Sequence, residues 1–228
     1  MQTDSIAILG GTGDQGLGLA FRFAQAGRAV VIGSRKEDRA VRAADEVREK
    51  VPGAEVAGFA NEFACQQSPI VILSVPFEHM VGTVKGIKDR LQAGQIVVSM
   101  GVPLATAIGD SAVRTIDVWQ GSCAELVQTQ VPQGVEVVSA FQNVSAHRLQ
   151  DLAHPVECDV VVSGARAARQ SVMALCPLVP GLRAVDGGPL GNARIVEQVT
   201  ALLIGLNIRY KLPEGLGIRF TGLPKSEP

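Results

Sequence analysis

The sequence predicts an α/β protein of the doubly wound type, with a mostly parallel sheet and helices on both faces. Short apolar segments alternate with longer segments of helical periodicity along the 228 residues. The short segments are apolar at nearly every position, which is typical of parallel strands that are buried on both faces. A glycine-rich turn also joins the first short segment to the first long one, as in nucleotide-binding sheets.

The first part of the chain contains six predicted strands and four predicted helices. Helices are indicated where apolar residues recur every three or four positions, as at Leu17, Ala20, Phe21 and Ala24. Strands are expected at 5–9, 29–32, 55–58, 70–74, 96–100 and 136–140, and helices at 16–26, 35–50, 80–91 and 123–130.

The alternation continues in the second part, with a strand at 159–163, a helix at 165–175, a strand at 183–185 and a helix at 192–210. That last helix is apolar around much of its surface, so it is expected to pack within the protein or against a second copy. We place a Rossmann-type domain at 1–153 and a smaller α/β lobe at 154–228. The tail after residue 210 is expected to be irregular.

Composition excludes several classes of function. Lys and Arg number 21 against 22 Asp and Glu, so no general attraction to nucleic acid or to an anionic membrane is expected. No apolar run approaches the roughly 18 residues that span a bilayer. The four cysteines form no CxxC pair, which disfavours a metal site or a disulfide framework and favours a cytoplasmic location.

The glycine turn matches the pattern GxGxxG at Gly11, Gly13 and Gly16, between a strand and a helix. In this context Gly11 permits a tight turn, Gly13 lets the backbone approach a pyrophosphate, and Gly16 lets helix and strand pack closely. The helix N-terminus attracts phosphate. The alternative is an ordinary strand-to-helix turn.

The end of the second strand indicates which dinucleotide binds. An acidic residue at this position favours NAD, whereas this chain has Gly33, Ser34, Arg35 and Lys36. A hydroxyl beside cations suits the 2′-phosphate of NADP, with Arg35 as a bidentate ligand and Lys36 or Arg39 as a further charge. The alternative is a solvated helix start.

The strand at 70–74 leads into Val75, Pro76 and His79, at the edge where doubly wound sheets bind ligands. These residues are expected to border the nicotinamide half of the dinucleotide. His79 is interpreted as a side chain at a helix start that bonds to the cofactor; the alternative is a general acid or base, which would need a substrate proton to move. His147 and His154 lack metal-ligand spacing and are expected to be surface or packing residues.

Longer stretches carry a family resemblance over almost the whole chain. These are GGTGDQGLGLA, VVIGSRK, VILSVPFEH, VVSAFQNVSA, GLRAVDGGPLGNARIVEQVT and GIRFTGL. In this order they resemble the NADPH-dependent coenzyme F420 reductases, also called F420-dependent NADP oxidoreductases. The resemblance implies a Rossmann domain with a smaller C-terminal lobe, a homodimer, and reversible hydride transfer between NADPH and the deazaflavin coenzyme F420.

The resemblance also implies which residues bind. The expected NADP contacts are Gly11, Thr12, Gly13, Asp14, Gln15, Gly16, Ser34, Arg35, Arg39, Val75, Pro76, His79 and Ala146. The expected deazaflavin contacts are Gln142, Val144, Gln198 and Thr200. No catalytic acid or base is assigned, because the reaction depends on positioning.

Two positions depart from the resemblance, since family members have His at the position of Gln142 and Ser at that of Gln198. Both lie on the presumed acceptor side. An NADPH-dependent flavin (FMN or FAD) or ferric reductase is therefore an alternative with the same fold. A redox-sensing NADP-binding protein without turnover is a third hypothesis, from a different class.

Overall fold

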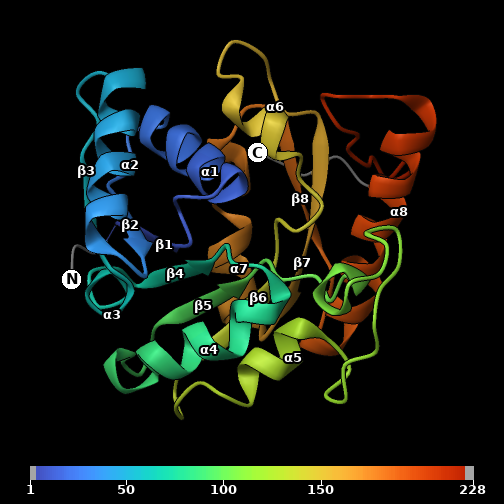
Figure 1. The fold of residues 1–228 in the computed structure, drawn as a ribbon, viewed down its shortest axis with the longest axis horizontal. Helices are drawn as coiled ribbons and strands as arrows, with labels where there is room; N and C mark the ends of the chain where they lie inside the picture. The colour runs from blue at the N-terminus through green and yellow to red at the C-terminus, as the bar shows by residue number, and fades with distance from the viewer. Residues whose placement is uncertain (1–3, 224–228) are drawn as a thin grey trace.

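The computed structural model describes residues 4–223 and contains one eight-stranded sheet (Figure 1). The strand order is β3-β2-β1-β4-β5-β6-β7-β8. The strands are β1 Ile6–Leu9, β2 Val30–Ser34, β3 Val56–Ala60, β4 Ile70–Leu73, β5 Ile96–Ser99, β6 Glu136–Ser139, β7 Cys158–Gly164 and β8 Leu182–Asp186. Every strand predicted from the sequence is present, which confirms the doubly wound fold class.

The helices are α1 Asp14–Gln25, α2 Glu37–Lys50, α3 Asn61–Ala64, α4 Phe77–Ile87, α5 Cys123–Gln128, α6 Ala146–Gln150, α7 Arg166–Met173 and α8 Ala193–Tyr210. Short 3-10 helices occupy Lys88–Arg90, Ala105–Ile108, Cys176–Leu178 and Leu190–Asn192. The sequence did not predict α3 or α6, and it placed the starts of α1 and α4 two or three residues too late. No helix within the described part of the chain is both long and apolar enough to cross a bilayer.

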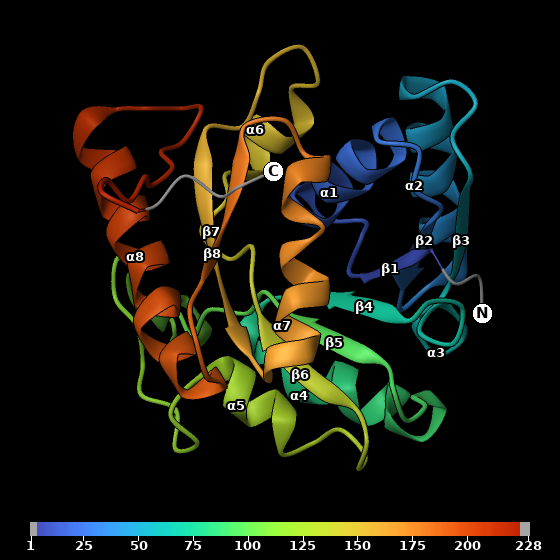
Figure 2. The same cartoon turned by 180° about the vertical axis from the view of Figure 1, so that it is seen from behind.

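The sheet is parallel except at one joint. β6 and β7 run antiparallel and pair only through Val138 with Gly164 and Ser139 with Ser163. β7 and β8 are parallel again. The last two strands therefore extend the sheet beyond the joint, and α7 packs on them in the view from behind (Figure 2).

Helices cover both faces of the sheet, as the apolar strands predict. Along β1, Ile6 and Ile8 belong to one core cluster with α1, α2 and α7. Ala7 and Leu9, which point the other way, belong to a second cluster with α4 and α5. Figure 1 shows α1 and α2 on one side of the first strands and α4 and α5 on the other.

The segment after α8 contains no regular element between residues 211 and 223, as expected. It is held to the sheet by the buried carboxylate of Asp159. That carboxylate accepts hydrogen bonds from Arg183 and Arg219 and from the backbone N–H of Phe220. These interactions hold the pKa of Asp159 down at about 2 against the opposing effect of burial.

Candidate functional site

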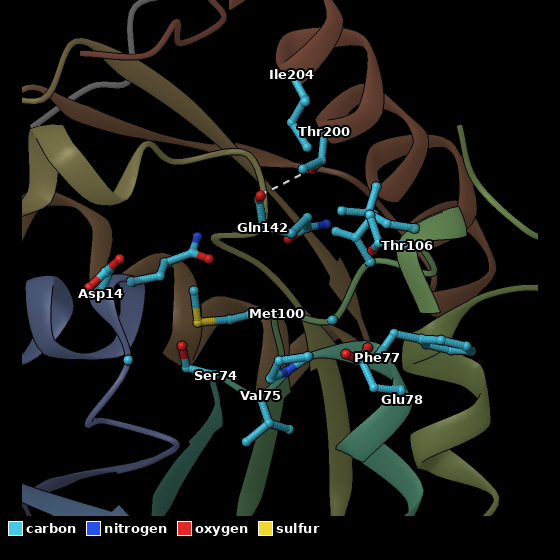
Figure 3. Close-up of a pocket in the computed structure, with 16 residues that line it drawn as sticks. Asp14, Ser74, Val75, Phe77, Glu78, Met100, Thr106, Gln142, Thr200 and Ile204 are labelled. Carbon is cyan, nitrogen blue, oxygen red and sulfur yellow. Dashed lines mark hydrogen bonds between the residues drawn. The ribbon is translucent and has the colours of Figure 1, made fainter. Parts of the chain in front are cut away.

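Three adjoining cavities follow the carboxyl ends of the parallel strands. The inner cavity, of about 520 Å³, lies between the end of β4, the segment after β5 and α8 (Figure 3). The middle cavity, of about 290 Å³, lies over the glycine turn and the end of β2. The outer cavity, of about 320 Å³, lies between α3 and α4.

The cavities share walls and so form one groove. The inner and middle cavities share Gly13, Ser74, Val75 and Pro76. The middle and outer cavities share Arg35, Asn61, His79 and Thr83. Ligands of open α/β sheets bind at this edge.

The glycine turn makes the close approach that its pattern predicts. Gly11 lies in the tight turn, where an added Cβ would come within 2.9 Å of the Ile8 carbonyl oxygen, and the left-handed backbone lies at the neighbouring Gly10, with φ of +79°. A side chain at Gly10 would also collide with the carbonyl of Ser74, the residue that follows β4. A Cβ at Gly16 would come within 2.9 Å of the Gly11 Cα, so close helix–strand packing at Gly16 is confirmed.

Gly13 differs from these glycines because the protein itself leaves room for a side chain there. The nearest atom to an added Cβ is the Gly10 carbonyl oxygen, at 3.5 Å. Gly13 is exposed, precedes α1 and lines both the middle and inner cavities. The free backbone N–H groups of the first turn of α1 therefore lie beside the groove, where they favour an anion.

Cations gather at the end of β2. Ser34, Arg35 and Arg39 line the middle cavity together with Thr12. Ser34 is buried and its hydroxyl accepts a hydrogen bond from the N–H of Lys36, 3.4 Å away. Within residues 4–223, neither Arg35 nor Arg39 forms an ion pair, and no acidic side chain lines the middle cavity. Both guanidinium groups are free to bind an anion.

The residues after β4 separate the cavities. Val75 and Pro76 lie between the inner and middle cavities. His79 lies one helical turn further along, in the wall between the middle and outer cavities and away from the inner one. The structure therefore brings Val75 and Pro76, but not His79, to the inner end of the groove.

Gln142, in the turn after β6, and Thr200, on α8, meet at the inner cavity. The Thr200 hydroxyl donates to the backbone carbonyl of Gln142 at 3.0 Å (Figure 3). The Gln142 side chain is buried and donates from Nε2 to the Ser139 hydroxyl at 3.0 Å. Its Oε1 has no partner among the described residues.

Contacts from distant segments hold the backbone that precedes Gln142. Phe141 has a φ of +67°, which is rare for a bulky residue. Gln15 donates from Nε2 to the carbonyl oxygens of Phe141 and Val144, at 3.0 and 3.1 Å. The Phe141 ring meets Phe23 edge-on, with the centroids 6.3 Å apart. The first turn of α1 thus positions one wall of the inner cavity.

Five of the predicted contacts line none of the three cavities, namely Gly11 and Gly16 of the glycine turn, Val144, Ala146 and Gln198. Val144 is buried. Ala146 begins α6 and packs towards Gly18 of α1. Gln198 is exposed on a side of α8 that faces away from the inner cavity, although Thr200 lines it. Asp14, in contrast, is exposed at the inner cavity.

Glu197 fastens α8 to α5 from inside the protein. Its carboxylate is 1% exposed and accepts hydrogen bonds from the backbone N–H groups of Cys123 and Ala124, at 2.8 and 3.1 Å. Burial raises the pKa of Glu197 to about 7, although these two hydrogen bonds act in the opposite direction. The carboxylate satisfies the start of α5 and fixes the helix on which Thr200 lies.

The sequence did not identify several residues of the groove. They are Gly10, Asn61, Glu62, Ser74, Phe77, Glu78, Gly82, Thr83, Gly86, Ile87, Met100, Gly101, Val102, Leu104, Thr106 and Ile204. Only a few had a usable signal. Gly10 belongs to the glycine pair, Ser74 ends a predicted strand, and Ile204 follows Thr200 at helical spacing.

Known proteins similar to this chain share its length and its fold. Residues 5–103 match the family described as NADP oxidoreductase coenzyme F420-dependent. The F420-dependent NADP reductase of Methanocaldococcus jannaschii is 48% identical, over 96% of this chain and 98% of that protein. The F420-dependent NADP reductase of Methanothermobacter thermautotrophicus is 43% identical, over 97% of each chain.

A solved structure extends the likeness of the fold. The protein from Arthrobacter sp. FB24, proposed to be an F420-dependent NADP reductase, superposes with a TM-score of 0.79. It covers 95% of this chain and all of its own, at 23% identity. Both the Rossmann-type sheet and the strands beyond it are thus found in a second protein.

Proposed function

Since the chain belongs to the family of F420-dependent NADP reductases, we propose that it transfers a hydride reversibly between NADPH and coenzyme F420. NADPH supplies the hydride, and the deazaflavin accepts it together with a proton from solvent. The protein contributes orientation, because the two reacting carbons must lie about 3–3.5 Å apart.

The division of charge along the groove supports this proposal more than any other observation. The middle cavity contains Arg35 and Arg39 and no acidic side chain, which suits the 2′-phosphate and pyrophosphate of NADP. The inner cavity contains Asp14 and Glu78 but no Lys or Arg, and it is bordered by Val75, Pro76 and Met100, which suits two stacked rings better than a phosphate. The two cavities meet at Val75 and Pro76, where the nicotinamide would enter the inner one.

The residues of this chain would divide the work as follows. The first turn of α1, from Gly13 to Gly16, would bind the pyrophosphate through backbone N–H groups. Ser34, Arg35 and Arg39 would hold the 2′-phosphate. Gln142 and Thr200 would form the acceptor side of the inner cavity, where the Gln142 side chain is buried away from water. For Val144, Ala146 and Gln198 the described contacts offer no support of a direct role.

The test is an absorbance assay of the purified protein with NADPH and, in parallel reactions, coenzyme F420, FMN and FAD. We expect the deazaflavin absorbance band to disappear in the reaction of NADPH with F420, and no oxidation of NADPH in the reactions with FMN or FAD. Oxidation of NADPH only with FMN or FAD would replace the proposal by a flavin reductase. Tight binding of NADPH with no oxidation in any reaction would favour the redox sensor.

We further propose that the protein is a homodimer in a reducing cytoplasm. Each chain would consist of two lobes, at 1–153 and 154–228. Ile195, Leu202 and Ile208 of α8 are each at least 60% exposed, and covering them needs a partner surface. All four cysteines are free and buried, which suits a reducing compartment. Sedimentation should give twice the 23.9 kDa mass of the chain, and a monomer at working concentration would contradict the dimer.

A further inference from the structure

Asn61 is a buried residue whose side-chain amide has no hydrogen-bond partner among residues 4–223. It follows β3 as the first residue of α3, is 8% exposed, and lines both the middle and outer cavities. Its Oδ1 has no hydrogen-bond partner among the described residues, and no described group hydrogen-bonds to the other end of the amide. Since a buried polar group without a partner is costly, this amide is suited to a ligand that enters the groove.

The charged side chains that line the outer cavity suit a nucleotide base better than a phosphate group. Glu62 and Glu78 both line it, against the single guanidinium of Arg35 that it shares with the middle cavity, and carboxylates repel a phosphate group. The middle cavity beside it contains no acid. A dinucleotide whose 2′-phosphate lies against Arg35 and Arg39 would therefore extend its neutral ring, and not a second phosphate, into the outer cavity.

The shape of the outer cavity suits a flat ring. Gly82 and Gly86 lie one turn apart on the same face of α4, and both line the cavity. A side chain at either position would meet nothing within 4 Å, so the surface of α4 is open and smooth there. The volume of about 320 Å³ is at the small end of the range for small-molecule sites.

We propose that the outer cavity binds the adenine of NADP and that the Asn61 carboxamide hydrogen-bonds to its 6-amino edge. An Asn amide offers one acceptor and two donors, which matches the amino group and the adjacent ring nitrogen of adenine. A turn about χ2 brings either end of the amide to the cavity. This inference rests on the proposed use of NADP and adds a residue that selects the base.

The decisive comparison uses NADPH and its hypoxanthine analogue, in which a carbonyl replaces the 6-amino group. Titration calorimetry of the full chain should give an affinity for NADPH about 10-fold higher than for the analogue. N61A and N61L, the second of which keeps the volume of the side chain, should each bind both nucleotides with equal affinity. The matched control is Gln67→Ala, which removes an exposed carboxamide just beyond α3 and should keep the preference.

The outcomes separate this inference from the proposed function. Equal affinity of the wild-type protein for both nucleotides, or a preference that persists in N61A and N61L, would overturn the role of Asn61 while leaving NADP binding intact. Failure to bind NADPH at all would instead reject the proposed function. Thermal unfolding of each variant should match the wild type, because the Asn61 side chain makes no hydrogen bond to the part of the chain that the structure describes.

Discussion

The middle and inner cavities adjoin, but they are built in different ways. The middle cavity is formed by residues close to strand ends, namely the glycine turn after β1, Ser34, Arg35 and Arg39 at the end of β2 and just beyond it, Asn61 after β3, and Val75 after β4. The inner cavity combines segments that are far apart in the sequence, such as Gln15 with Phe141 and Gln142 with Thr200. A nucleotide site can thus follow from local sequence, whereas the acceptor site depends on long-range contacts.

The largest effect is expected at the glycine turn. Gly10→Ala combines a left-handed φ with a collision against the Ser74 carbonyl, so we expect a loss of about 4 kcal/mol of stability. Urea unfolding measures it. Gly27→Ala is the control for φ alone, because Gly27 has a φ of +77° and open space around it. Equal losses in the two variants would show that the contact with β4 is unimportant.

Glu197 tests whether the inner cavity depends on the attachment of α8. Since its folded pKa of about 7 lies above the ordinary 4.5, the folded state holds more protons than the unfolded state between these values. Stability should therefore fall as the pH rises through this window, by up to about 3 kcal/mol. Urea unfolding at pH 5, 6, 7 and 8 should show this slope in the wild type.

Glu197→Gln should flatten the slope and raise the KM for the acceptor more than that for NADPH, because α8 borders only the inner cavity. The control is Glu136→Gln, at the exposed start of β6, which should keep the wild-type slope. A slope that is unchanged in Glu197→Gln would mean that another group titrates.

The two cavities also differ in how far the sequence predicts them. The apolar strands predicted the sheet, and the offset from GxGxxG to Arg35 predicted the middle cavity. The four-residue α3 and five-residue α6 are too short to show helical periodicity, so Asn61 had no recognisable context. Gln198 and Thr200 are two residues apart on α8 and cannot face the same cavity, which the helical repeat alone could have shown.

Arg35 provides a test of the middle cavity, with a smaller expected change in free energy. Arg35→Ala should lose a charge-assisted hydrogen bond to the 2′-phosphate, worth about 2 kcal/mol or close to 30-fold in the KM for NADPH. The KM for NADH should change little, because NADH lacks that phosphate. Arg42→Ala is the matched control, since Arg42 lies on α2, the helix that follows Arg35, pairs with Asp38 and lines none of the three cavities. Equal changes for NADPH and NADH would remove the 2′-phosphate role of Arg35.

Thr200 provides the smallest and most local test of the inner cavity. Thr200→Val keeps the shape of the side chain but removes the hydrogen bond to the Gln142 carbonyl, so we expect a loss of about 1 kcal/mol in stability. The released Gln142 backbone should raise the KM for the acceptor several-fold and leave the KM for NADPH unchanged. Thr129→Val removes a similar hydroxyl-to-carbonyl bond at the exposed end of α5 and should alter neither KM. A parallel rise in both KM values for Thr200→Val would mean that the two cavities are mechanically coupled through Val75 and Pro76. The two cavities would then still differ in how they are built, one from local and one from long-range contacts, but they would not function independently.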